Sequence, residues 1–244
     1  MLDSITSTAG GWIDSLWDVI NRVFIFDARY TLWLEGLGNT LIIAFFALII
    51  GLVFGFFLAV IRVFHGASEN PSWILRILNR ITKIFVTIIR GTPVMVQLLI
   101  FHFIILVSVR NGVLVGIIAF GINSSAYASE IFRGGILSVD KGQTEAGRSL
   151  GLNYRQTMSR IILPQAIKNS LPALGNEFIT VLKETSLAGV IAITDVTRAA
   201  QQIRGRTFDP TPLIFLAIIY LIMVLFLEFL IGRLERRLRR SDQR

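Results

Sequence analysis

The chain has 244 residues, of which 53% are hydrophobic and 16% are charged, and its net charge is +8. With a mean hydropathy of +0.67, this composition excludes a soluble globular domain and indicates an integral membrane protein. The chain has no cysteine, which excludes disulfides and thiolate metal sites, and its two histidines lack the spacing of an HExxH zinc motif. We therefore expect no metal site and no catalytic residues.

Residues 1–36 are expected to form an interfacial segment ahead of the first membrane span. Their apolar residues recur at helical spacing and include several aromatics: Ile5, Trp12, Leu16, Trp17, Ile20, Val23 and Phe24. Such a stripe suits the headgroup layer. The segment lacks the basic and apolar regions of a cleaved signal peptide, so we expect it to lie flat on the outer surface.

The rest of the chain carries long apolar stretches. A membrane-spanning helix needs about 20 mostly apolar residues, and four stretches meet this requirement: 41–64, 84–109, 113–132 and 213–231. A fifth stretch, 172–193, is interrupted by polar residues and is weaker in hydropathy. Its polar residues include Asn176, Glu177, Lys183 and Glu184. We count it as a span because of the charge distribution, and so predict an all-α protein with five transmembrane helices.

Lysine and arginine accumulate in the cytoplasmic loops of membrane proteins, which fixes their orientation. With five spans, residues 61–83, 133–168 and 233–244 share one side and carry four, six and six basic residues, against six on the other side. This distribution predicts an outer N-terminus and an inner C-terminus. We expect a transmembrane domain at 37–232, with a cytoplasmic loop at about 134–165, and a basic cytoplasmic tail at 233–244. The positive charge indicates topology and contact with membrane lipid, not nucleic-acid binding.

The segment 144–151 is polar and lies between hydrophobic stretches. It cannot lie in hydrocarbon, because its polar groups would lose their water without replacement. It is therefore expected at the membrane surface, where it could contact a partner. No GxxxxGK[ST] phosphate-binding loop occurs in the sequence, so any ATP hydrolysis that drives transport must take place on another polypeptide.

Five motifs occur in order between residues 90 and 188, within a stretch from about residue 39 to the end of the chain that resembles a known family. They are RGTPVMVQL at 90–98, YASEIFRGGI at 127–136, KGQTEA at 141–146, IILPQA at 161–166 and KETSLA at 183–188. Together they resemble the motifs of the polar amino-acid subfamily of ABC importer permeases. Two positions depart from the usual family pattern, Gly147 in place of a second alanine and Glu184 in place of aspartate. The resemblance implies a type I ABC importer arrangement in the bacterial plasma (inner) membrane.

The resemblance also implies a coupling helix, a short helix, turn and second helix that insert into a groove on a partner ATP-binding cassette ATPase. The implied coupling residues are Glu145, Ala146, Gly147, Ser149, Leu150 and Gly151. Small residues there would let two backbones approach closely, and Pro164 would mark the turn back to the membrane. ATP and Mg would bind to the partner ATPase, and this chain would carry no cofactor. The alternative is a solvated amphipathic loop with no partner.

Polar residues inside spans are costly and mark functional sites, although many only join helices. Helical spacing places Asn123, Tyr127 and Glu130 on one face of a span, and Asn176, Thr180 and Lys183 on one face of another. We expect these stripes and the segment around Pro93 to line one wet cavity. The candidate substrate-binding residues are Arg90, Thr92, Gln97, Asn123, Tyr127, Asn176, Glu177 and Thr180.

Two positions within these stripes are distinctive. Pro93 frees the carbonyl of Ile89 from its helical donor and should kink or break the span, either to expose backbone to substrate or simply for packing. Glu177, inside a span, must pair with a base such as Lys183 or Arg90, be protonated, or meet a cationic ligand. We expect it to contact the amino group or basic side chain of a polar amino acid such as arginine, histidine or lysine. The alternative is a structural ion pair with Lys183.

The remaining expectations concern partners. The GxxxG sequence at 51–55 offers a close-packing face to another helix, and we expect a dimer with a second, identical or paralogous permease around a central pore. The polar loop 194–211 would, as the resemblance implies, meet an extracytoplasmic amino-acid-binding protein. The main alternative is a proton-coupled secondary transporter that uses Glu130 or Glu177 as proton carrier. Neither that nor a passive channel explains the polar segment at 144–151.

Overall fold

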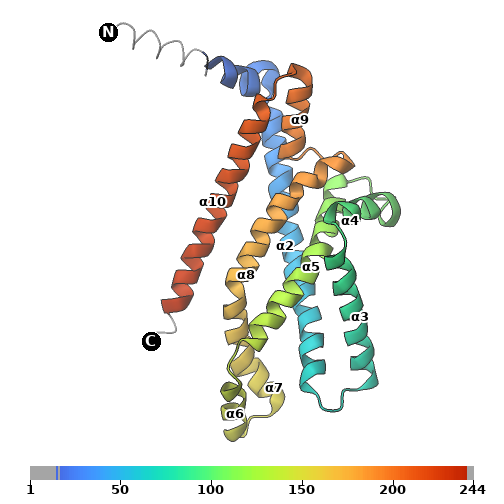
Figure 1. Cartoon of the computed structure of the whole chain (residues 1–244), viewed down its shortest axis with the longest axis vertical. Coiled ribbons are helices and arrows are strands. Elements are labelled where there is room, and N and C mark those ends of the chain that lie inside the picture. Colours follow the sequence, from blue (N-terminus) through green and yellow to red (C-terminus); the bar gives the residue numbers. More distant parts are fainter. Residues whose placement is uncertain (1–14, 16, 241–244) are drawn as a thin grey trace.

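The structure is a computed structural model that describes residue 15 and residues 17–240 (Figure 1). All regular elements of this part of the chain are helices, which confirms the all-α prediction. The α-helices are α2 (Tyr30–Ala67), α3 (Trp73–Gly91), α4 (Val94–Ile100), α5 (Gly112–Leu137), α6 (Lys141–Ser149), α7 (Tyr154–Thr157), α8 (Leu163–Glu184), α9 (Val196–Thr207) and α10 (Thr211–Arg240). Between them lie π-helical turns at η1 (Asn21–Ile25), η3 (Phe101–Ile105) and η4 (Met158–Ile162), and 3-10 turns at η2 (Phe26–Ala28) and η5 (Thr185–Ile191).

Helices α2, α5 and α10 are long and apolar enough to cross a membrane, and they contain three of the predicted spans. A bent pair, α3 with residues Val94–Ile105, meets the same requirement when its two parts are taken together. Helix α8 does not meet it, because of its polar residues. The protein is thus a multi-pass membrane protein by composition and helix length, while five spans and the orientation remain predictions.

The predicted span 84–109 is interrupted. Helix α3 begins earlier, at Trp73, and ends at Gly91, and the chain then turns by 109° into the next helical segment. The break falls at Thr92 and Pro93, where a break was predicted. Proline has no amide hydrogen and disfavours helical geometry in the residue before it, and Thr92 is indeed extended, with φ −119° and ψ 146°.

The centre of the protein is the crossing of α2 and α5. A β-carbon on Gly51 would lie 2.7 Å from Ser124 Oγ, and one on Gly55 would lie 2.6 Å from Ala128 Cβ. The GxxxG sequence therefore packs closely against a helix, as predicted, but that helix is α5 of the same chain. This corrects the expectation that it offers a surface to a second permease subunit.

The segment 194–211, expected to be a loop, contains helix α9, which lies beside the N-terminal segment and the start of α10 (Figure 1). Its apolar residues recur at helical spacing, and they are buried against Val23 and Trp33. These residues are Val196, Ala199, Ala200 and Ile203. The predicted polar loop is therefore wrong, because a buried apolar stripe lies among its polar side chains.

Only part of the predicted N-terminal stripe can be placed. Ile5, Trp12 and Leu16 lie outside the described residues. Trp17 is exposed, whereas Val23 is buried in the cluster with α9. The C-terminal part of the stripe thus packs against protein.

Pro164 does not mark a turn, which corrects another expectation. Helix α7, the π-turn η4 and α8 follow one another without a break, and Pro164 lies in the first turn of α8. The wider hydrogen bonding of the preceding π-turn allows the helical path to continue through it.

Candidate functional site

The break between α3 and α4 is stabilised by Gln97. Its Nε2 donates hydrogen bonds to Ile89 O at 2.7 Å, to Thr92 O at 3.1 Å and to Thr92 Oγ1 at 2.8 Å. The Nδ2 of Asn123 on α5 donates to Gln97 Oε1 at 2.9 Å. Gln97 and Asn123 are both buried, so the carbonyl that Pro93 frees is bound within the protein. Three of the predicted substrate-binding residues, the buried Gln97 and Asn123 and the exposed Thr92, therefore meet in one hydrogen-bonded cluster.

A second pair of predicted residues meets nearby. The guanidinium carbon of Arg90 lies 5.3 Å from the ring centroid of Tyr127, a cation–π contact between α3 and α5. Arg90 also lines a cavity of about 260 Å³ together with Glu130. The other residues around this cavity are Arg62, Lys83, Val86 and Thr87. Arg90 therefore lies near Tyr127 and Glu130. It is not the partner of Glu177, for which it had been considered as a base.

Glu177 of α8 is 8% exposed, and its Oε1 accepts a hydrogen bond from Ser124 Oγ of α5 at 2.7 Å. The ion pair with Lys183, the alternative considered for Glu177, does not form within the described chain, because Lys183 lies on the exposed side of α8. A donor hydroxyl is neutral and offers no compensating charge. The buried carboxylate is therefore without a cation among the described residues.

Asn176 and Thr180 remain on the exposed face of α8, where Thr180 Oγ1 donates to Asn176 O at 3.1 Å. They lie apart from the cluster of Gln97 and Asn123. The structure thus groups some of the predicted residues, Thr92 with Gln97 and Asn123 and Arg90 with Tyr127. Glu177 instead contacts Ser124, the residue that links α5 to it. Ser124 was missed in the sequence, where only its position in a span as a small polar residue marked it.

Glu130 is held by two arginines. Arg133 Nε and Nη2 donate to Glu130 Oε2 at 3.0 Å and 2.8 Å, and Arg62 Nη1 donates to Oε1. Arg62 lies near the end of α2, so its ion pair with Glu130 joins α2 to α5, whereas the pair of Arg133 with Glu130 lies within α5. Sequence reasoning counted Arg62 only among the basic residues of segment 61–83 that set the orientation, although an arginine inside the predicted span 41–64 is itself unusual.

The predicted coupling residues lie on α6 and the turn that follows. Asp140 caps α6 by accepting from Gly142 N at 2.7 Å, and the side chain of Asn153 caps α7. The helix–turn–helix that the resemblance implied is therefore present. Gly151 lies in the turn with φ +82°, a conformation that favours glycine.

Exposure separates the coupling residues into two groups. Glu145, Ala146, Ser149, Leu150 and Gly151 are exposed, and Leu150 is 80% exposed. Gly147 instead is buried. A β-carbon there would lie 2.7 Å from Thr157 Cγ2. Its small size therefore serves packing within the chain, which corrects the expectation that it faces a partner.

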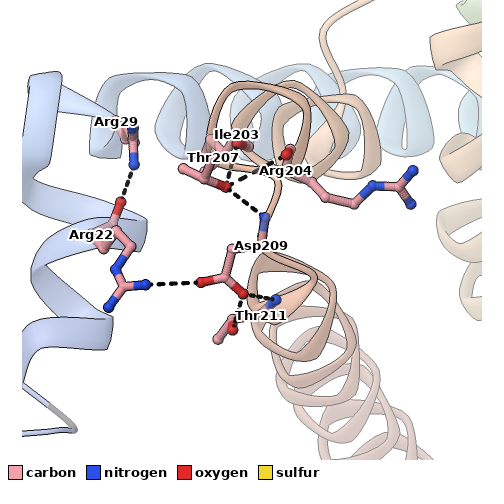
Figure 2. Close-up of polar contacts among 7 residues, drawn as sticks. All are labelled: Arg22, Arg29, Ile203, Arg204, Thr207, Asp209 and Thr211. Atoms are coloured by element: carbon pink, nitrogen blue, oxygen red, sulfur yellow. Dashed lines mark hydrogen bonds and ion pairs between the residues drawn. The ribbon is translucent and has the colours of Figure 1, made fainter.

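At the opposite end of the protein, Asp209 contacts both the N-terminal segment and the start of α10 (Figure 2). Arg22 Nη1 lies 3.5 Å from Asp209 Oδ2, and Thr211 N donates to Asp209 Oδ1 at 2.9 Å. The hydroxyl of Thr211 also donates to this carboxylate. These hydrogen bonds, with a smaller contribution from Arg22, lower the pKa of Asp209. The preceding residue, Phe208, is left-handed at φ 56° and 93% exposed.

Comparison with known proteins identifies a consistent set of relatives. Residues 51–240 match the family described as the binding-protein-dependent transport system inner membrane component. The glutamine transport system permease protein of Escherichia coli strain K12 is 37% identical over 230 residues, covering 92% of this chain and 96% of that protein. The arginine transport system permease protein of Bacillus subtilis strain 168 is 38% identical over 214 residues, covering 86% and 93%. A crystal structure of an amino acid ABC transporter with histidines has a TM-score of 0.77 at 40% identity, covering 88% of this chain and 98% of that one.

Proposed function

Since the chain belongs to the family of inner membrane components of binding-protein-dependent transport systems, we propose that it passes a basic amino acid across the inner membrane. The protein is the permease subunit of an ABC amino-acid importer, with the type I importer fold. ATP hydrolysis belongs to a separate ATPase chain, and delivery of the cargo belongs to a binding protein, as in the rest of the family. The proposal that the cargo is a basic amino acid goes one step beyond this family assignment.

Glu177 is the single observation that carries this choice. Its carboxylate is buried between α5 and α8, and its hydrogen-bond partner is the neutral hydroxyl of Ser124. A buried carboxylate without a cation is costly. A cationic amino group or guanidinium that approaches α8 supplies the missing charge, so passage of a basic amino acid past Glu177 is favoured over passage of an acidic one. A structure of related proteins with histidines agrees with such a cargo.

The other candidate residues extend the path along α3, α4, α5 and α8. Arg90, which lies over the ring of Tyr127, offers a cation to the cargo carboxylate. The amides of Gln97 and Asn123 beside Thr92 hold the break at Pro93 in place. Asn176 and Thr180 present polar groups from the exposed face of α8. A second permease subunit, identical or paralogous, closes the path on that face.

Transport is coupled through α6. The exposed Leu150 and Glu145 enter a groove of the partner ATPase, which binds ATP and Mg and closes on the coupling helix. The N-terminal segment and α9, joined by the ion pair of Asp27 with Arg206, receive the amino-acid-binding protein at the other end of the protein.

The test is uptake into proteoliposomes that contain the complete transporter with its binding protein. We expect Glu177→Gln to lower uptake of labelled arginine, lysine or histidine at least tenfold and to leave binding-protein docking intact. Glu228→Gln, an acid-to-amide change at an exposed position of α10, is the matched control. Unchanged selectivity among arginine, histidine, glutamine and glutamate in Glu177→Gln would contradict a basic cargo.

The second candidate function is proton-coupled secondary transport, in which Glu177 carries the proton. It is favoured by the same burial of Glu177, but it leaves the exposed coupling segment without a role. Uptake that follows an imposed pH gradient in proteoliposomes without ATP would establish proton-coupled transport in place of ATP-driven import.

A further inference from the structure

A cavity of about 440 Å³ lies between the end of α2 and the helices α6 and α7. Its walls come from the last turns of α2, the end of α5 and the segment from Val139 to Ile162. The cavity therefore lies where the apolar part of α2 ends and the polar coupling segment begins. That is the depth of the lipid headgroups on this side of the membrane.

The polar side chains around this cavity are cationic or hydroxylic. Arg62, Arg133 and Lys141 supply the charge, and Thr144 and Tyr154 supply hydroxyl groups. Burial raises the pKa of Tyr154, so its hydroxyl remains protonated at neutral pH and can donate a hydrogen bond. The lining contains no acidic side chain.

The charge of the two arginines is only partly compensated. Glu130 binds both, but it lines the neighbouring cavity instead of this one. One carboxylate cannot neutralise three cations, and Lys141 forms no ion pair with the described residues. The bonds to Glu130 use Nη1 of Arg62 and Nε and Nη2 of Arg133. The remaining guanidinium N–H groups are left for an anion, while Glu130 holds both guanidinium groups in position.

The rest of the lining is apolar. Binding of a free inorganic anion would not require such apolar walls. Val63, Ile136, Leu137, Met158 and Ile162 form these walls, and Leu137 is 66% exposed. A ligand with a phosphate group at one end and a hydrocarbon chain at the other matches both parts of the cavity.

We propose that this cavity binds an anionic phospholipid, with the headgroup phosphate between Arg62, Arg133 and Lys141. One acyl chain lies against the apolar walls formed by α2 and α5. The lipid bridges the end of α2 and the coupling segment, and so stabilises the position of α6 against the transmembrane helices. This inference goes beyond the proposed cargo and does not depend on it.

The test is native mass spectrometry of the full-length chain purified with its transporter subunits, titrated with phosphatidylglycerol and with phosphatidylcholine. We expect saturable retention of phosphatidylglycerol and little retention of phosphatidylcholine. Lys141→Gln should weaken phosphatidylglycerol binding roughly fivefold, the effect of removing one basic residue at an anionic lipid surface. Lys83→Gln is the control, because Lys83 lines only the neighbouring cavity. Lys141 is chosen because loss of either arginine would also disturb Glu130.

Equal retention of phosphatidylglycerol by the unchanged protein and by Lys141→Gln would overturn the proposal. So would equal binding of the two lipids. A parallel titration with inorganic phosphate distinguishes the source of the anion. Stabilisation by millimolar phosphate against heat, lost in Lys141→Gln, with no preference for phosphatidylglycerol, would overturn the lipid in favour of a soluble phosphate. Because the readout is lipid binding and not uptake, a failure here is separable from a failure of the proposed cargo.

Discussion

Gly55 of α2 lies so close to Ala128 of α5 that a β-carbon at residue 55 would be 2.6 Å from the Ala128 Cβ. The carbonyl oxygen of Ser125 would lie at 2.9 Å, so backbone as well as side chain blocks a larger residue. Small residues allow such close approach of membrane helices, whose association depends on packing. This contact fixes the relative position of the two helices that carry Arg62, Asn123, Ser124 and Glu130.

We expect Gly55→Leu to destabilise the protein by about 3 kcal/mol or more, because overpacking at a close contact forces the helices apart. The measurement is thermal unfolding of the detergent-solubilised complex. Gly38→Leu is the control in the same helix, since a β-carbon on Gly38 would meet no atom within 4 Å. An equal loss of stability in both variants would contradict the role of Gly55 in the α2–α5 contact.

The break at Pro93 depends on Gln97. Gln97→Met retains the approximate size of the side chain but leaves Ile89 O and the Asn123 amide without their partner. A buried polar group left unpaired costs about 1–3 kcal/mol, so we expect a corresponding loss in free energy of unfolding in denaturant. Gln201→Met, at an exposed position of α9, should change it by less than about 0.5 kcal/mol. Indistinguishable effects of the two variants would show that the break is stable without Gln97.

A substitution at Leu150 tests whether the coupling segment binds to the ATPase. It is 80% exposed at the end of α6, so Leu150→Asp should leave the fold intact while placing a charge in the proposed ATPase groove. We expect ATPase activity that depends on cargo and binding protein to fall roughly tenfold or more, as for the anchor residue of an interface. Leu150→Met keeps an apolar side chain and should retain this activity. Full coupling with aspartate at position 150 would exclude burial of this residue by the ATPase.

Asp209 makes the outer contact pH-dependent. Hydrogen bonds from Thr211 and the charge of Arg22 lower its pKa below the usual 3.8. A carboxyl whose pKa is lowered by folding stabilises the folded state above its unfolded pKa, and this stabilisation disappears as the pH falls through the lower folded value. We therefore expect hydrogen-exchange protection of residues 204–216 to be constant above pH 5 and to decrease on acidification below about pH 4.

The control for this pH dependence is Asp209→Asn, which removes the titrating group but retains an oxygen acceptor for Thr211. Protection in this variant should be lower near neutral pH and should not change on acidification. Identical pH profiles for the two proteins would assign the effect to another group.

Several elements could be predicted because their cause lies within one stretch of sequence. The apolar runs around residues 41–64, 113–132 and 213–231 lie inside α2, α5 and α10, because a long apolar run can satisfy its backbone in a membrane only as a helix. The break at Pro93 followed from the missing amide of proline. The family also followed from the sequence, since five ordered motifs need no three-dimensional information.

The errors concern segments in which polar and apolar residues alternate. Helix α9 was taken for a loop because its buried face is short and lies among arginines and glutamines. Pro164 was taken for a turn because the π-turn before it leaves no signature in the residues themselves. The stripe of α9 at 196, 199, 200 and 203 has helical spacing and was readable in the sequence, whereas the π-turn before Pro164 shows only in the structure.

The sequence by itself determined that this protein crosses a membrane, that its family transports amino acids, and which polar residues lie on each helix face. These properties depend on composition, on motif order and on the fixed period of a helix. Only the tertiary structure decided which residues meet: Glu177 with Ser124, Glu130 with Arg62, and Gly55 with Ala128. Such pairs depend on the rotation and crossing of whole helices, which are set by the packing of all side chains together and cannot be read from the spacing within any single helix.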